Sequence, residues 1–406
     1  MVKRKEPFEL IECIGTGGFA QTWYARVIDP DLIEDWGSEY AAIKIPLSKE
    51  KEKALKKEFH IYIALQSQLT RKESINIAKY LGVEVFQDKF VMAMEYIPDG
   101  SLRNLIGKIG AWKRLDIPDA VDIAIGVLKG ISVIHKKHVV HRDIKPDNIL
   151  MVGKLPKIAD FGIGRILRSN ELASTTTGTL YYMSPEILYE DKGALANTDL
   201  WSFGIMLYEM LCEDFPFGIN KDMPPGKVMD LIRDEKAQLV FSNTLNIPQE
   251  FKNVISKMLR RNPNERYKTA DEALEDLFNM KRGDDDCKKE LLALQGLLHD
   301  PVQVPAAEKQ LNKLLKKFPN SHDIYLQFGE FYNRCGDFDR ALEIFKKGIK
   351  SDSGYALFHW GMSIAYQQKR DYRSALSALE TALLKGLEPR VERQAKAMLR
   401  MLQQKI

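Results

Sequence analysis

Three side chains of complementary chemistry lie within one short stretch of the chain, HRDIKPDN at positions 141–148. Asp143 can accept a proton from an attacking hydroxyl, and Lys145 can neutralise charge on a phosphoryl group. Asn148 offers a carbonyl oxygen, which is a hard ligand suited to Mg²⁺. This spacing favours a reaction at a phosphate, assisted by a divalent cation.

Two charged residues elsewhere in the chain suit the same chemistry. Asp160, in the Asp-Phe-Gly run at 160–162, comes 17 residues after Asp143 and offers an anionic oxygen to the same cation. Lys44 lies in AAIKI at 41–45, where apolar neighbours on a predicted strand make an unpaired ammonium costly. We therefore expect Lys44 to pair with an acid and to direct its ammonium toward a phosphate.

Glu58 is the acid that the sequence favours as the partner of Lys44. The helix predicted at 49–69 has an apolar face that repeats at helical spacing and is formed by Leu55, Phe59, Tyr62 and Leu65. Because this face is expected to point inward, Glu58 is expected to point inward as well, and Phe161 to pack beneath the helix. Glu52 is the alternative acid, and an ammonium that extends into solvent is the alternative without a partner.

The loop at 15–20, GTGGFA, has little side-chain bulk and lies between two predicted strands. Such a loop lets backbone N–H groups approach phosphate oxygens closely. Taken alone, a glycine-rich hairpin turn explains the same residues almost as well.

Other charged residues are expected to support the site rather than to react. Glu186, in Ser-Pro-Glu at 184–186, is expected to form an ion pair with Arg266. Asp199 is expected to accept hydrogen bonds from backbone N–H groups of the segment at 141–148. We interpret both acids as structural.

The elements that must position these residues change in kind along the chain. The first 120 residues mix strand-like alternation with helical periodicity, and the pattern after Pro118 is mostly helical, beginning with an amphipathic segment at 119–135. The predicted strands are 8–14, 22–27, 40–45 and 90–96. The run KRGDDD at 281–286 interrupts the helical pattern and predicts a charged linker at 281–287.

Beyond residue 287 the sequence repeats at a constant offset. Similar residues recur at this offset in the pairs Gly329/Ser363, Tyr332/Tyr366, Phe338/Tyr372, Ala341/Ala375 and Phe345/Leu379. The two members of each pair are 34 residues apart. A helix–turn–helix unit of 34 residues resembles the tetratricopeptide repeat. The resemblance implies an all-α solenoid with units at 288–321 (degenerate), 322–355 and 356–389, and a capping helix at 390–406. An unrelated helical bundle is the alternative.

Taken in order, the motifs within residues 8–280 resemble the signature of eukaryotic-type (Hanks-type) serine/threonine protein kinases. The order is a glycine-rich loop, a strand lysine, a helix glutamate, HRD with a following asparagine, DFG, and SPE in place of APE. The resemblance implies an α+β two-lobed protein-kinase fold that binds ATP and Mg²⁺, or Mn²⁺ in its place, between the lobes. It also implies transfer of the γ-phosphate to Ser or Thr hydroxyls of protein substrates.

The resemblance assigns roles residue by residue. The implied catalytic residues are Asp143, Lys145, Lys44 and Glu58, and the implied metal ligands are Asn148 and Asp160. The implied nucleotide-binding residues are Ile14, Gly15, Gly17, Gly18, Ala20, Thr22, Ala42, Lys44, Met94, Glu95, Ile97 and Leu150. Within this set Met94 is the implied gatekeeper, residues 95–97 the hinge, and Ala42 and Leu150 the residues on either side of the adenine.

Some details refine the resemblance. Lys145 and Thr179 fit the serine/threonine class, whereas Ala20 and Thr22 replace the usual glycine and valine of the loop without changing a charge. Arg142 precedes the implied base, as in kinases that are switched on when a phosphate on the activation loop pairs with such an arginine. The candidate phosphorylation sites are Thr175, which we favour, Thr176 and Thr177. An unmodified polar loop is the alternative.

Composition limits the other classes of function. The chain of 406 residues carries 60 basic and 56 acidic side chains, and a net charge of +4 is too small to indicate a nucleic-acid or membrane partner. The most apolar stretch, 201–212, is too short to span a bilayer, and the four cysteines form no metal-binding or redox pair. We therefore expect a cytoplasmic protein without a membrane span.

Two alternatives to an active protein kinase are considered. A pseudokinase scaffold would act through nucleotide and peptide binding, but such scaffolds commonly lose one of the residues Lys44, Asp143, Asn148 and Asp160. A small-molecule kinase of related fold is expected to lack the Ser-Pro-Glu segment, its arginine partner and the repeats. The repeats themselves are expected to bind a peptide or protein partner.

Overall fold

The computed structural model describes residues 6–161, 177–188, 196–241, 247–298, 304–319, 321–351, 355–387 and 389–405. The chain divides into two compact units. The first comprises Met1–Val240 and Gln249–Leu277, and the second comprises Phe241–Pro248 and Phe278–Ile406. Each unit is described separately below.

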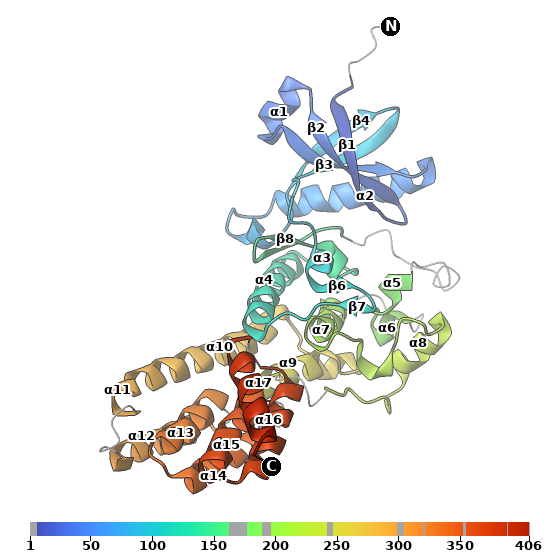
Figure 1. Ribbon diagram of the computed structural model, residues 1–406. Coiled ribbons are helices and arrows are strands. Elements are labelled where there is room, and N and C mark those ends of the chain that lie inside the picture. Colours follow the sequence, from blue (N-terminus) through green and yellow to red (C-terminus); the bar gives the residue numbers. More distant parts are fainter. Residues whose placement is uncertain are drawn as a thin grey trace. The chain divides into compact units, whose positions relative to one another are not determined.

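The first unit begins with an antiparallel sheet of five strands in the order β1-β2-β3-β5-β4 (Figure 1). The strands are β1 (Phe8–Thr16), β2 (Ala20–Val27), β3 (Tyr40–Pro46), β4 (Tyr80–Phe86) and β5 (Lys89–Met94). The strands predicted at 8–14, 22–27, 40–45 and 90–96 are thereby confirmed, whereas β4 was not predicted. Register places Thr22 opposite Lys44, and Lys44 opposite Met92, so the glycine-rich turn and the lysine share neighbouring strands.

Helix α2 (Lys49–Gln66) covers one face of this sheet. Ser48 begins the helix by accepting a hydrogen bond from the N–H of Lys51, and acidic residues in the first turn favour the positive end of the helix dipole. Its buried positions are Leu55, Glu58, Tyr62 and Leu65, which recur at helical spacing. One of them, Tyr62, meets the Phe161 ring edge-on with centroids 4.5 Å apart, so Phe161 packs against α2 as predicted.

The opposite face of the sheet is covered by an element that the sequence patterns did not reveal. Helix α1 (Pro30–Trp36) lies between β2 and β3, and Asp29 caps its first turn. The buried Trp36 ring stacks on Phe8 with centroids 5.6 Å apart. Both faces of the sheet are therefore buried, which explains why apolar residues run continuously through the middle of β3.

The rest of the first unit is mainly helical. Its longer helices are α4 (Ile117–Lys136), α7 (Ala196–Cys212), α8 (Pro225–Arg233) and α9 (Gln249–Met258), followed by α10 (Ala270–Ala293), which extends into the second unit. Short helices are α3 (Leu102–Ile106), α5 (Thr177–Leu180), α6 (Pro185–Leu188) and the 3-10 turns Glu73–Asn76, Pro146–Asn148, Pro216–Gly218 and Pro263–Glu265. Short strands pair as β6 (Gly107–Lys108) with β7 (Ala111–Trp112), and β8 (Ile149–Val152) with β9 (Leu155–Ile158).

Helix α7 forms the centre of this helical part, since it is buried on nearly all sides. The predicted ion pair between Glu186 and Arg266 is present, with N–O distances of 2.7 and 2.8 Å. Both side chains are buried, so the pair joins α6 to the segment before α10 without contact with water. Removing one partner of such a pair leaves an uncompensated buried charge.

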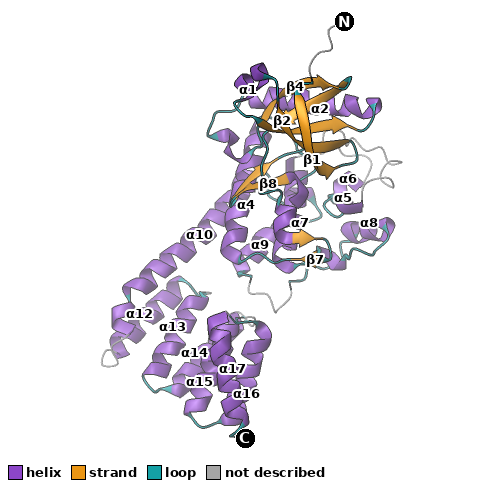
Figure 2. Cartoon of the chain, turned by 45° about the horizontal axis from the view of Figure 1, so that its top comes forward, coloured by secondary structure: helices purple, strands orange, loops and turns teal. Residues whose placement is uncertain are grey.

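Every described element wholly within the second unit is helical (Figure 2). The helices are α11 (Gln295–Leu298), α12 (Val304–Lys317), α13 (His322–Arg334), α14 (Phe338–Ser351), α15 (Ala356–Gln368), α16 (Tyr372–Lys385) and α17 (Pro389–Gln403). The offset between the bounds of α13 and α15 is the same as the offset between the bounds of α14 and α16. This structural period equals the sequence period seen in pairs such as Tyr332/Tyr366.

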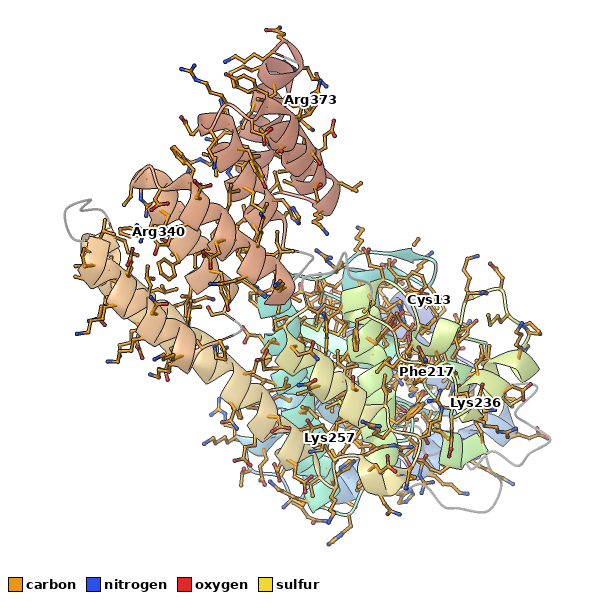
Figure 3. All side chains as sticks on the ribbon, turned by 90° about the horizontal axis from the view of Figure 1, so that it is seen from below. Cys13, Phe217, Lys236, Lys257, Arg340 and Arg373 are labelled. Atoms are coloured by element: carbon orange, nitrogen blue, oxygen red, sulfur yellow. The ribbon has the colours of Figure 1, made fainter. Side chains whose placement is uncertain are left out.

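One phenylalanine shows how these helices pack. The ring of Phe345 on α14 lies where a Cβ atom would stand at Gly329 of α13 or Gly361 of α15, within 2.3 Å of either position. Arg340, labelled in Figure 3, lies on α14 as Phe345 does, and its guanidinium is 4.9 Å from the centre of the Tyr332 ring on α13. The two glycines admit the ring between neighbouring helices.

The prediction of a break in secondary structure at 281–287 is wrong. Helix α10 continues through this segment, and the division between the two units falls at Leu277. The helix persists because Cys287 and Leu291, one turn apart, are buried in the core of the second unit. One glycine costs a helix only about 1 kcal/mol, which such burial offsets.

We predict opposite effects for the same substitution at two helical glycines. Gly329→Ala should lower the free energy of unfolding by about 1 kcal/mol, because the clash with Phe345 exceeds the gain in helix propensity. Gly283→Ala should raise it by up to about 1 kcal/mol, because nothing lies within 4 Å of its Cβ position. Urea denaturation followed by circular dichroism measures both, and equal stabilisation by the two would contradict the described packing.

Candidate active site

Lys44 lies between two acids contributed by distant parts of the chain. Its Nζ donates to Glu58 Oε1 at 2.8 Å and Oε2 at 3.1 Å, and to Asp160 Oδ1 at 2.9 Å. The predicted partner Glu58 is therefore correct, whereas Glu52 pairs with Lys56, one turn further along α2. Burial tends to lower the pKa of Lys44, but Asp160 and Glu58 outweigh it and hold the pKa above its usual value.

The backbone around this ion pair adopts unusual conformations. Asp160 follows β9 with φ at 58°, and Arg142 has φ at 67°, both in the left-handed region that non-glycine residues seldom occupy. Asp160 is fixed by its neighbour Ala159, whose N–H donates to the Asn148 carbonyl at 2.9 Å. Strained residues of this kind persist where surrounding contacts hold them, often at functional sites.

The segment at 141–148 gathers its polar groups around Asp143. The Asn148 amide donates to Asp143 Oδ2 at 2.8 Å, and Lys145 Nζ lies 3.0 Å from the same oxygen. Lys145 also donates to Thr179 Oγ1 at 3.0 Å, as the serine/threonine pattern implied. Two side chains of the motif, those of Lys145 and Asn148, therefore converge on the carboxylate of the third, Asp143.

Asp199 fixes the backbone of this segment through hydrogen bonds. Its carboxylate accepts hydrogen bonds from the backbone N–H groups of His141 at 2.8 Å and Arg142 at 2.7 Å. It also lies 2.8 Å from His135 Nε2 of α4. The predicted structural role of Asp199 is confirmed, since a fully buried acid fixes the backbone on which Asp143 lies.

A cavity of about 750 Å³ opens between the glycine-rich turn and this segment. Residues of the predicted catalytic and metal-binding set line it: Lys44, Glu58, Asp143, Lys145, Asn148 and Asp160. Of the predicted nucleotide-binding residues, Ile14, Gly15, Gly17, Gly18, Ala20 and Thr22 also line it. Both groups thus share one space whose volume suits a small-molecule ligand.

Five predicted nucleotide-binding residues do not line this cavity, namely Ala42, Met94, Glu95, Ile97 and Leu150. Ala42 and Met94 are paired across β3 and β5 and are buried in the core beneath α2. Glu95 turns its carboxylate to Lys157, with its Oε1 2.7 Å from Nζ. Their expected contact with adenine stays a prediction.

The phosphorylation candidates lie largely outside the described residues. Thr175 and Thr176 are not among them, and Thr177 is the first residue of α5. Their modification therefore also stays a prediction.

Several contacts at the site had no signal in the sequence. The hydroxyl of Tyr80, on the unpredicted strand β4, donates to Glu58 at 3.1 Å. Lys51 Nζ, from the first turn of α2, donates to the carbonyl of Gly18 at 2.6 Å and so holds the glycine-rich turn. Both contacts join residues far apart in sequence, and neither residue belongs to a recognisable motif.

Arg103 of α3 is the centre of another contact set that the sequence did not indicate. Its guanidinium donates to Glu209 Oε1 at 2.7 Å, to the Tyr182 hydroxyl at 2.6 Å and to Asp147 Oδ2 at 3.3 Å. Glu209 belongs to the central helix α7, and Asp147 adjoins Asn148. The largely buried guanidinium therefore connects the catalytic segment to the core of the helical part.

The oxygen atoms of Asn148 and Asp160 are suitable ligands for a hard divalent cation. Asn148 uses its amide nitrogen toward Asp143, which leaves its carbonyl oxygen for a ligand, and only Oδ1 of Asp160 is engaged by Lys44. Among the described residues no group of three or more His, Cys, Asp or Glu side chains is arranged so that it could bind a metal ion. A cation here would take the remaining ligands from phosphate oxygens and water, as Mg²⁺ usually does.

The fold and the cavity together define the two-lobed architecture of the protein kinase type. The family model for the protein kinase domain matches residues 8–279, and the chain belongs to the protein kinase family. The contact between Lys145 and Thr179 agrees with the serine/threonine class of this family, which the sequence motifs implied.

Curated relatives carry the same class in their names. The chain is 31% identical over 280 residues to a probable serine/threonine-protein kinase of Clostridium perfringens, covering 68% of this chain and 38% of the relative. It is 29% identical over 336 residues to a probable serine/threonine-protein kinase of Clostridium acetobutylicum, covering 80% and 46%. A serine/threonine-protein kinase of Dictyostelium discoideum is 30% identical over 264 residues, covering 63% and 44%.

The chain thus spans less than half the length of these relatives. None of the described helices combines the length and apolar character that crossing a bilayer requires.

We predict that Lys44→Met lowers kcat/KM for ATP by about 10²–10³-fold, because it leaves the buried carboxylate of Glu58 and the partly exposed carboxylate of Asp160 without their shared cation. Lys57→Met is the matched control, since Lys57 is exposed on α2, the helix that carries Glu58, and its loss should change activity by less than about twofold. Initial rates with radiolabelled ATP measure both. Equal activity of the two variants would show that the ion pair is not needed.

Proposed function

We propose that the protein is an ATP-dependent serine/threonine protein kinase that transfers the γ-phosphate of ATP to Ser and Thr hydroxyls of protein substrates. The observation that carries this proposal is the convergence of Lys44, Asp143, Lys145, Asn148 and Asp160 on one cavity beside the glycine-rich turn. A pseudokinase scaffold does not require this complete set.

Each charged residue has a distinct part in the proposed reaction. Asp143 accepts the proton of the attacking hydroxyl and orients it, while Lys145, 3.0 Å from Asp143, offsets charge on the transferring group. Lys44, fixed by Glu58, holds the inner phosphates. Asn148 and Asp160 would hold Mg²⁺, or Mn²⁺ in its place, and the ion when bound neutralises charge on the outer phosphates.

The remaining nucleotide contacts follow from the family resemblance. Backbone N–H groups of the loop at 15–20 would cover the phosphates, and Met94 with residues 95–97 would meet the adenine. Ala42 and Leu150 would lie on either side of the base. The backbone of Leu150 pairs with Ser101, which lines the cavity, so this part of the proposal is consistent with the local fold.

The test of this function is Asp143→Asn. Turnover should fall by at least about 10³-fold, because the amide cannot accept the proton, whereas the dissociation constant for ATP should change by less than about threefold. Radiolabel transfer to casein measures turnover, and calorimetry with ATP and Mg²⁺ measures binding. Wild-type protein that binds ATP but transfers no phosphate would favour the scaffold instead.

We also propose that the protein phosphorylates its own activation loop, with Thr175 as the first acceptor and Thr176 and Thr177 as neighbouring ones. The support is Arg142, a cation next to the catalytic base, which suits pairing with a phosphate of about two negative charges.

Replacing both Thr175 and Thr176 with alanine should therefore lower the activity reached after preincubation with ATP by about tenfold. The reason is that the variant cannot form the charge-assisted hydrogen bonds between a loop phosphate and Arg142. The activity before preincubation should match that of the wild type. Rates compared before and after preincubation provide the measurement, and mass spectrometry identifies the modified residue. Unchanged activation of the double variant would reject the switch.

For the helical unit we propose tetratricopeptide-like repeats at 288–321, 322–355 and 356–389 with a capping helix at 390–406, acting as a binding surface for a peptide or protein partner. The support is the constant offset that relates the bounds of α13 to those of α15 and the bounds of α14 to those of α16. Stacked helix pairs of this kind form extended surfaces that suit peptides or helices. A cytoplasmic location is part of the same proposal.

A further inference from the structure

Three side chains on one face of α2 contact the same tyrosine of β4. Glu58, Tyr62 and Gln66 follow one another at four-residue steps and therefore lie on the same side of the helix. All three contact Tyr80, the first residue of β4, which is 2% exposed. This strand did not emerge from the sequence patterns, and Tyr80 belongs to none of the kinase motifs.

The contacts fix both the backbone and the ring of Tyr80. The side-chain amide of Gln66 donates to the Tyr80 carbonyl at 3.2 Å and accepts from the Tyr80 N–H at 3.3 Å. The ring packs on Tyr62 with centroids 3.4 Å apart. These contacts leave the phenol one position, in which its hydroxyl donates to Glu58 Oε1 at 3.1 Å.

Glu58 needs this second donor because of where it lies. The residue is 8% exposed, and among the described residues Oε1 accepts from both Lys44 and Tyr80 while Oε2 accepts from Lys44 alone. A buried carboxylate with too few donors loses a large part of its favourable hydration without compensation. Burial raises the pKa of Tyr80 well above its usual value, so the phenol stays protonated and remains a donor.

We propose that Tyr80 is a positioning residue for phosphoryl transfer, which acts by fixing the carboxylate of Glu58 against Lys44. The inference rests on the proposed kinase function and adds to it a residue from outside the recognised motifs. Without the phenolic donor, the carboxylate has fewer restraints, and the ammonium of Lys44 loses its fixed direction toward the cavity. Nucleotide would still bind, but less often in the reactive geometry.

Tyr62 provides a matched control on the same helix face. It is as buried as Tyr80 and packs against the same ring, but within the described residues no hydrogen bond joins its hydroxyl to Glu58. Tyr62→Phe and Tyr80→Phe therefore remove the same atom from the same apolar environment. Only the second removes a donor to Glu58.

The experiment measures kcat and KM for ATP in the full chain, with radiolabelled ATP and casein. Tyr80→Phe should lower kcat by about three- to tenfold, the usual net contribution of one hydrogen bond, with KM changed by less than about twofold. Tyr62→Phe should leave kcat within about twofold of the wild type. Thermal melting of both variants checks that the core is intact.

A double-mutant cycle separates positioning from general packing. In a Glu58→Gln background the further substitution Tyr80→Phe should change kcat by less than about twofold, because the group through which Tyr80 acts is already altered. An equal loss of kcat in both backgrounds would overturn the inference, and so would equal rates of Tyr80→Phe and Tyr62→Phe. A wild-type protein without phosphotransfer would instead overturn the proposed function, so the two failures are distinguishable.

Discussion

The buried ion pair between Lys44 and Glu58 is the interaction on which the rest of the first unit depends. A lysine inside a sheet-and-helix core is tolerated only when anionic partners compensate for its lost hydration. Its partners come from α2 and from the Asp-Phe-Gly segment that follows β9, at separations of 14 and 116 residues. The sheet, the helix and the Asp-Phe-Gly segment must therefore all be in place before the charge is satisfied, which couples folding of the lobe to formation of the site.

Buried acids serve the same purpose in the helical part of the first unit. Asp199 holds the backbone beside Asp143, Glu209 holds Arg103, and Glu186 holds Arg266. Asp199 and Glu209 lie on α7 and Glu186 on α6. Asp199 and Glu186 each reach a segment outside the regular helices and strands, whereas Glu209 reaches the short helix α3. Buried networks of hydrogen bonds and ion pairs in which every group has a partner are rigid, so they hold the reactive groups in fixed positions relative to the core.

The second unit is stabilised in a different way. Its helices pack through apolar faces, with Phe345 filling the space that two glycines leave on neighbouring helices. Each helix pair contacts mainly the next one along the chain, so stability accumulates from neighbour to neighbour. Shape complementarity rather than buried charge holds this unit together.

The order of the residues alone was enough to identify the motif residues, the strands with clear alternation and the period of the C-terminal helices. These are local properties, since spacing along a strand, a helix or a repeat is written directly in the chain. The ion pair of Glu186 with Arg266 and the role of Asp199 could also be predicted, because family motifs carry those contacts.

Tertiary packing was needed to establish which acid reaches Lys44, that α10 continues through KRGDDD, that Ala42 and Met94 lie in the core beneath α2, and that Tyr80 meets Glu58. Each of these outcomes depends on how a helix is rotated and on which distant strand lies beside it. Local periodicity sets which side chains share a face, but burial against the rest of the chain decides what that face contacts.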